Sequence, residues 1–183
     1  MEKKDKKSLT DYFGIVALKL GGQIHLRTLR DAFASIMPFM ILAGFITFIN
    51  YVILEPTGFM GKIVNPQTLT EWQKIGVSVS NGTLNIITLL IGVAIAYYLS
   101  VNRGYKNVLA SILVTLSSIF VVTPFVSMFK PEGIEKAFTI NGVIPVSYMN
   151  ASGMFVGIIV GLVATDLFIK LSSNKKLEIN IAG

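Results

Sequence analysis

The sequence contains no cysteine and only one histidine, His25, in 183 residues. Disulfides, thiolate metal sites and cysteine nucleophiles are therefore excluded, and so is a histidine-rich metal cluster. Charged residues are also scarce, at 14% of the chain, whereas soluble domains contain about 25%. Hydrophobic residues make up 52%, and the mean hydropathy is +0.67. This composition is typical of a membrane protein.

Motifs that carry chemistry are missing as well. The chain has no Gly-rich phosphate loop of the Walker type and no pair of carboxylates at catalytic spacing. We therefore predict no catalytic residue, no metal and no cofactor in this chain.

Long runs without charge indicate how the chain meets the membrane. The run between Asp31 and Glu55 is 23 residues long, and a bilayer core of about 30 Å needs about 20 helical residues. Because these runs lack the two-residue alternation of barrel strands, helices are expected. We predict an all-α polytopic membrane protein of about four transmembrane helices, in the runs 32–54, 75–102 (apolar core 84–99), 107–129 and 137–165 (helix at about 151–171).

The distribution of Lys and Arg predicts the orientation. With the N-terminus inside, twelve of the 16 basic residues lie on the inner side and four on the outer side. Both termini are thus expected in the cytoplasm, and the net charge of +6 is a topology signal that argues against nucleic-acid binding. The predicted organisation is a flexible tail (1–8), an amphipathic interfacial helix (9–27), a four-span domain (28–172) and a second cytoplasmic tail (173–183).

The entry into the first span reads "LRDAFASIMPFMILAGF". We expect Arg27 and Arg30 to anchor the helix at the anionic inner headgroups, and Asp31 to favour the positive end of the helix dipole. Pro38 is expected to kink the helix, which a membrane tolerates where Ser35 or a neighbouring helix satisfies the freed backbone group.

Small and polar residues recur at helical spacing within the other spans. Their most ordinary role is close helix packing, with a solute path as the alternative. The predicted packing residues are Asn85 and Thr88 (in a stripe with Asn81 and Gly92), Ser111, Thr115 and Ser118, and Gly153, Gly157 and Gly161.

Two ionisable residues have alternative interpretations. Asp166 is the one acid within a predicted span, where acids often mark ion routes, but Lys170 lies one helical turn further on. An interfacial ion pair is therefore the preferred interpretation. His25 lies among polar residues before the first span, which does not favour a catalytic role. In the last outer loop, Asn141–Gly142 between "AFTI" and "VIPV" predicts the turn of a short outer hairpin.

Three stretches in this order resemble a known family. They are "LTDYFGIVALKLGGQIHLRTLRDAFASIMPFMILAGF", "AYYLSVNRGYKNVLASILVTLSSIFVVTP" and "ASGMFVGIIVGLVATDLFIKL". Within the first stretch, the matching positions are His25, Leu26, Leu29, Arg30, Asp31 and Pro38. Together they are similar to the membrane-embedded enzyme IIC component of the bacterial sugar phosphotransferase system, of the lactose/cellobiose/chitobiose type, over about residues 9–172. Ser100 and Gly44–Phe45 depart mildly from the family pattern.

The resemblance implies a plasma-membrane permease that imports a disaccharide while cytoplasmic IIB and IIA components phosphorylate it. It also implies that family members are more than twice as long and that the absent part holds the sugar site with its functional His and Glu. His25 does not match that histidine. This chain, apparently truncated, would then be the N-terminal scaffold and homodimer-building part, embedded in the bilayer. The alternative is a small oligomeric channel, or a regulatory or assembly subunit, without sugar chemistry.

Overall fold

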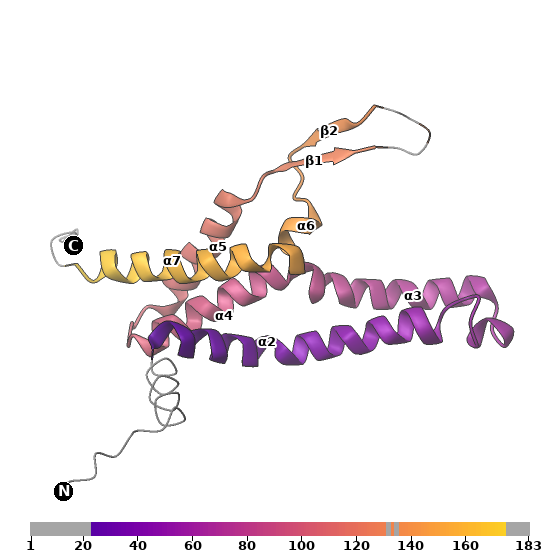
Figure 1. Ribbon diagram of the computed structural model, residues 1–183, viewed down its shortest axis with the longest axis horizontal. Coiled ribbons are helices and arrows are strands. Elements are labelled where there is room, and N and C mark those ends of the chain that lie inside the picture. The colour runs from indigo at the N-terminus through magenta and orange to yellow at the C-terminus, as the bar shows by residue number, and fades with distance from the viewer. Residues whose placement is uncertain (1–22, 131–132, 134–135, 175–183) are drawn as a thin grey trace, which may run out of the picture.

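The computed structural model describes residues 23–130, 133 and 136–174. The predicted tail 1–8, the greater part of the predicted interfacial helix and residues 175–183 of the second tail lie outside these residues. In the part described, helices dominate and one two-stranded sheet projects from them (Figure 1). This agrees with the predicted helical membrane class.

The first span is helix α2, Ile24–Phe48, which continues through a π-helical segment, Ile49–Ile53, to give 30 residues of apolar helix. Helix α2 begins at Ile24, inside the range 9–27 predicted for the interfacial helix, of which residues 9–22 lie outside the described residues. Asp31 lies about two turns inside α2, so its predicted interaction with the positive end of the helix dipole is wrong. Asp31 instead pairs with Arg27 at 3.8 Å and with Arg30 at 2.8 Å. These ion pairs neutralise the charge of Asp31 within α2.

The second span is longer than the sequence predicts and is broken in two. Helix α3, Pro66–Asn81, precedes a 3-10 turn, Leu84–Ile86, and helix α4, Ile87–Asn102. Pro66 occupies the first turn of α3, and the Asn65 side chain caps it by accepting a hydrogen bond from the Gln67 amide at 2.9 Å. Because α3 contains charged residues, the criterion of charge-free runs did not predict the whole of this helix.

The third predicted span contains a helix of only 15 residues, α5, Val108–Val122. At about 1.5 Å per residue it is about 22 Å long. The helix ends at Val122 because Pro124 forces Thr123 into an extended conformation. Within the described residues, three helices are long and apolar enough to cross a membrane, at 24–53, 66–102 and 151–172. The count of four full spans is therefore not confirmed.

A hairpin follows α5; its second strand overlaps the predicted strand "AFTI", but its first strand precedes it instead of being "VIPV". Strand β1, Val126–Phe129, pairs antiparallel with β2, Phe138–Asn141. Asn141–Gly142 follows β2 instead of connecting the strands, so its assignment as the hairpin turn was wrong. Gly142 has φ of 77° and donates its amide to the Phe125 carbonyl, which closes the base of the hairpin.

The chain then returns through a short helix, α6, Val146–Met149, to α7, Met154–Ser172. Helix α4 is the centre of the fold, because α2, α5 and α7 all pack against it. Its buried Ile87, Ile91 and Ile95 form the core together with Ala32 and Ile36 of α2.

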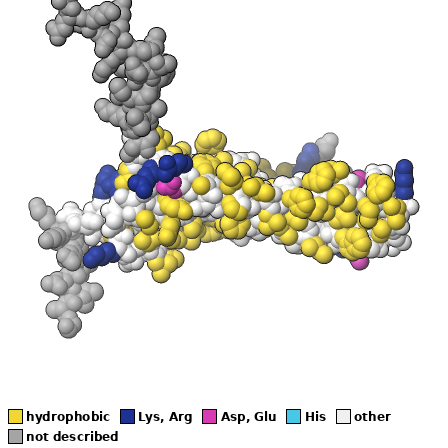
Figure 2. All heavy atoms as spheres, turned by 90° about the horizontal axis from the view of Figure 1, so that it is seen from below, with side chains coloured by type: hydrophobic (Ala, Val, Ile, Leu, Met, Phe, Trp, Pro, Cys, Tyr) yellow, Lys and Arg dark blue, Asp and Glu magenta, His cyan; other side chains and the backbone are white. Residues whose placement is uncertain are grey.

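Beyond this bundle, α3 and the second half of α2 run side by side as an arm (Figure 1). Figure 2 shows hydrophobic side chains over the face between the two ends of the molecule, and basic side chains gathered near the end where α2 begins. An apolar band between charged ends is the pattern that a bilayer requires.

Candidate functional site: the junction of α4, α5 and α7

The glycines of α7 lie where this helix meets α4. A Cβ atom on Gly157 would come within 2.5 Å of the Thr88 carbonyl oxygen, and one on Gly161 within 3.2 Å of the Ile95 Cβ. Because both contacts exclude a larger side chain, these two glycines permit the close approach of the helices. Gly153 belongs to the preceding 3-10 turn and packs mainly against the backbone of Tyr148. A Cβ on Gly153 would also lie 2.9 Å from the Thr88 Oγ1 of α4. All three glycines therefore face α4, although Gly153 precedes α7.

The contacts of α4 fix the direction of its neighbours. Thr88 and then Ile95 meet Gly157 and then Gly161, so α4 and α7 run parallel. On its other side, Gly92 admits the side chain of Ile119 from α5. Gly92 is therefore a contact point for both neighbouring helices, since a Cβ atom on Gly161 would lie 3.4 Å from the Gly92 Cα.

The polar residues predicted on one face of the second span separate at its break. Thr88 is fully buried and donates a 2.9 Å hydrogen bond to the Asn150 carbonyl. Asn85 lies in the 3-10 turn and donates to the Asn81 side chain at 2.6 Å. Because the helix ends at Asn81 and restarts at Ile87, the assumption of a continuous helical stripe was wrong.

The hydroxyl residues of α5 make three kinds of contact. Thr115 is paired with Thr165 of α7, with 2.8 Å between their Oγ1 atoms. Ser118 donates to the Val114 carbonyl of its own helix at 2.8 Å. Ser111 is buried, and its hydroxyl has no hydrogen-bond partner among the described residues. Of these three residues, Thr115 alone forms a hydrogen bond to another helix in the described part of the chain.

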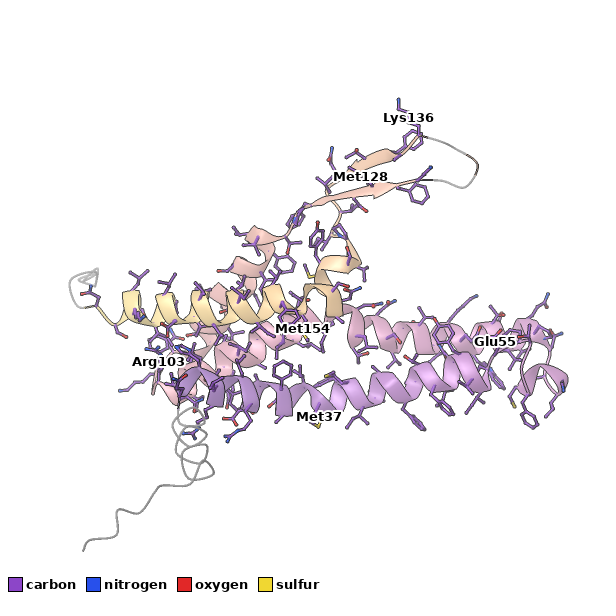
Figure 3. The ribbon with its side chains drawn as sticks, in the orientation of Figure 1. Met37, Glu55, Arg103, Met128, Lys136 and Met154 are labelled. Carbon is purple, nitrogen blue, oxygen red and sulfur yellow. The ribbon has the colours of Figure 1, made fainter. Side chains whose placement is uncertain are left out.

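A charge cluster closes one end of the junction. Asp166 forms ion pairs with Arg103, from the end of α4, and with Lys170 at 2.8 Å. The predicted pair with Lys170 is confirmed, whereas the pair with Arg103 was not predicted. Figure 3 shows Arg103 near one end of the molecule and Glu55 near the other end. His25 and Asp166 line one shallow hollow of about 310 Å³ with Leu162, Val163 and Leu167.

Contacts between α2 and its neighbours were missed by the search for stripes. Ser35 shares a 2.6 Å hydrogen bond with the Tyr98 hydroxyl of α4, a contact between helices that was not predicted. Pro38 itself lies within α2 and is exposed. At the start of α2, Asn102 donates to the buried Thr28 hydroxyl at 3.1 Å.

The arm has its own polar contact. The Asn50 side chain donates to the Gln73 carbonyl at 3.0 Å, and the Gln73 side chain donates to the Asn50 carbonyl at 2.9 Å. Gly76 leaves the space that the Asn50 side chain fills. A single buried Asn between apolar neighbours is a weak signal in a sequence, although its position in a membrane run makes it notable.

The membrane-interface residues Arg27 and Arg30 have exposed side chains near the start of α2. Among the described residues, no group of three or more His, Asp or Glu side chains could hold a metal ion. The junction thus consists of close helix packing, hydrogen bonds and ion pairs.

Comparison with known proteins identifies the class to which this helical membrane fold belongs. Residues 30–181 match the family model described as "Phosphotransferase system, EIIC". The chain therefore belongs to the EIIC family of the phosphotransferase system.

Two similar relatives come from characterised bacteria. The chain is 30% identical over 154 residues to the lichenan permease IIC component of Bacillus subtilis, covering 84% of this chain and 33% of the relative. It is 27% identical over 168 residues to the cellobiose-specific EIIC component of Geobacillus stearothermophilus, covering 90% and 36%.

A solved structure has the same fold. The crystal structure of the transporter ChbC, the IIC component of the N,N'-diacetylchitobiose-specific phosphotransferase system, matches with a TM-score of 0.79 and 26% identity. The match covers 95% of this chain and 39% of ChbC. The chain thus spans about a third of the curated relatives that it matches.

Proposed function

We propose that this chain is the N-terminal part of a sugar permease that imports a β-linked disaccharide of the cellobiose or chitobiose class, coupled to its phosphorylation. The family match over residues 30–181 is the observation that carries this proposal. The names of the similar proteins, which refer to lichenan, cellobiose and diacetylchitobiose, support the sugar class. Cytoplasmic IIB and IIA components would supply the phosphate.

Within such a permease, this chain would be the scaffold and homodimer interface, with residues 28–172 as one membrane domain and both termini in the cytoplasm. The arm supports this role, because its side chains contact little else in the described part of the chain. Phe45, Tyr51 and Ile75 on the arm are each more than three-fifths exposed. An exposed apolar surface of this kind favours association with lipid or with a second subunit.

Uptake of sugar tests the permease role. Membranes without their own matching permease would contain this chain alone, this chain joined to the downstream part of the cellobiose-specific component, or that downstream part alone. We expect accumulation of phosphorylated cellobiose only with the joined protein. Equal activity of the downstream part alone would contradict the scaffold role, and activity of this chain alone would place the sugar chemistry within residues 1–183.

Cross-linking tests the homodimer separately. Because the chain has no cysteine, Ile75→Cys introduces a single thiol on the arm. We expect an oxidised dimer from this variant, and none from Val163→Cys, a control on the exposed side of α7. Dimers from both variants at equal yield would indicate random collisions and contradict an interface on the arm.

A further inference from the structure

One hollow outside the junction combines amide groups with apolar and aromatic side chains. It has a volume of about 410 Å³ and lies where α3 ends, beside α4, α5 and α6. Small-molecule sites range from about 300 to 1,000 Å³ and have mainly apolar walls with a few polar groups. The residues that line this hollow are Asn81, Asn85, Ile86, Leu89, Phe120, Ile144, Val146 and Met149.

The break in the second span creates the polar part of this hollow. Asn81 is the last residue of α3, and Asn85 lies in the 3-10 turn before α4. Their 2.6 Å hydrogen bond uses one donor of Asn85 and one lone pair of Asn81. Each amide has two N–H donors and a carbonyl acceptor, so both donors and acceptors remain for a ligand.

The chemistry of the walls limits the ligand. Amides facing hydrocarbon would lose their hydrogen bonds to water, so a lipid chain is a poor occupant. Among the residues that line the hollow none is ionisable, which disfavours a charged ligand. A sugar has hydroxyls that both donate and accept, together with C–H faces that pack on Phe120, Leu89 and Ile86. Broken membrane helices are also a recurrent feature of transporter substrate sites.

From these observations we infer that the hollow between Asn81, Asn85 and Phe120 is a contact site for a neutral β-linked disaccharide. The inference rests on the proposed permease function. It is separate from the sugar site that the resemblance assigns to the absent part of the permease. The two amides bind sugar hydroxyls, and Phe120 packs against a ring face.

Protection of an introduced thiol tests this site directly. Val146→Cys on the rim of the hollow, in the full chain reconstituted in nanodiscs, reports access to a charged thiol reagent. At a cellobiose concentration about three times the Kd, labelling should slow about fourfold, because only empty sites react. Thr139→Cys, an exposed position on β2 outside the lining residues, should be unaffected. Mannitol at equal osmolality controls for solvent effects.

Removal of one amide provides the second test. Asn85→Leu in the Val146→Cys background should label at the unprotected rate without sugar and lose the protection by cellobiose. An unchanged basal rate shows that this variant retains its fold around the hollow. If Asn85→Leu disturbs the basal rate, Asn81→Ala serves as the second variant, with the same expected loss of protection.

The outcomes separate this inference from the proposed function. No protection up to the solubility limit of cellobiose, or equal protection by mannitol, overturns the contact site and leaves uptake by the joined permease intact. Persistent protection in Asn85→Leu and Asn81→Ala likewise overturns it. Protection without uptake by the joined permease supports the contact site and contradicts the permease role.

Discussion

Thr115 and Thr165 face each other in the interior of the α4, α5 and α7 junction, with their Oγ1 atoms 2.8 Å apart and both side chains fully buried. One hydroxyl donates to the other, so each side chain has a hydrogen-bond partner within the protein. Within a membrane domain, such a pair links two helices without exposing a polar group to lipid.

Replacing both threonines should cost less free energy of unfolding than the sum of the two single replacements. Thr165→Val leaves the Thr115 hydroxyl without its partner, at a cost of about 1 kcal/mol in the free energy of unfolding. The double variant Thr115→Val/Thr165→Val removes both polar groups, so its cost should be smaller than the sum of the single costs. The free energy of unfolding is measured by circular dichroism in a denaturing detergent for the unchanged chain, Thr115→Val, Thr165→Val and the double variant.

Ser118→Ala is the control for this cycle, because Ser118 bonds only to its own helix at Val114. Its effect should stay within about 0.5 kcal/mol. Costs that simply add in the double variant would mean that the two hydroxyls are not coupled.

Gly157 and Gly44 should respond in opposite directions to the same substitution. Gly157→Ala places a methyl group 2.5 Å from the Thr88 carbonyl oxygen and 3.1 Å from the Ile91 Cγ2, so α7 must move away from α4. Overpacking of this kind costs about 1–3 kcal/mol. At Gly44, apart from the adjoining residues and the backbone of the same helix, no described atom lies within 4 Å of the new Cβ, and Ala in a helix gains about 0.5–1 kcal/mol over Gly.

Thermal unfolding of both variants in the same detergent compares the two glycines. A loss at Gly157 together with no loss at Gly44 is expected. Similar shifts in both would show that backbone propensity, and not helix contact, decides the result.

The membrane class and the last span could be predicted because they depend on local composition. The fourth run predicts a helix at 151–171, and the structure has one candidate span at 151–172. Charge-free runs fail where a helix carries charges, as α3 does with Glu71 and Lys74. They fail again where Pro124 ends α5 before the apolar run ends.

The partners of individual side chains could not be predicted, because they depend on distant segments. Ser35 and Tyr98 are 63 positions apart, and Arg103 and Asp166 come from different helices. The Asp166–Lys170 pair was predictable because both residues lie one turn apart on one helix. The break at Asn81–Ile87 separates Asn85 from Thr88, which helical spacing alone had placed on one face.

Asp166 should matter more to stability than its exposed partner. Asp166→Asn removes the charge that neutralises Arg103, whose side chain is 26% exposed and whose Nε is buried without a hydrogen bond among the described residues. We expect a cost of about 1–3 kcal/mol, since a largely buried cation is left unpaired. Lys170→Ala breaks an ion pair whose lysine is 63% exposed, and it should cost less than about 1 kcal/mol.

Salt dependence of unfolding checks the assignment of these two pairs. The Lys170 contribution should decrease in high salt, because exposed pairs are screened, whereas the Arg103 contribution should change little. A larger loss from Lys170→Ala than from Asp166→Asn would contradict the dominant role of the Arg103 pair.

Single cysteines at Asn85 and Thr88 separate a scaffold from a channel. Asn85 lines an open hollow, whereas Thr88 of α4 is fully buried and donates its hydroxyl to the Asn150 carbonyl. A small water-soluble thiol reagent should therefore label Asn85→Cys and leave Thr88→Cys unlabelled in intact cells. Because the chain has no native cysteine, any label on the purified chain is attached to the introduced thiol. Rapid labelling at both positions would require water along this face of α4 and would favour the channel alternative over the scaffold.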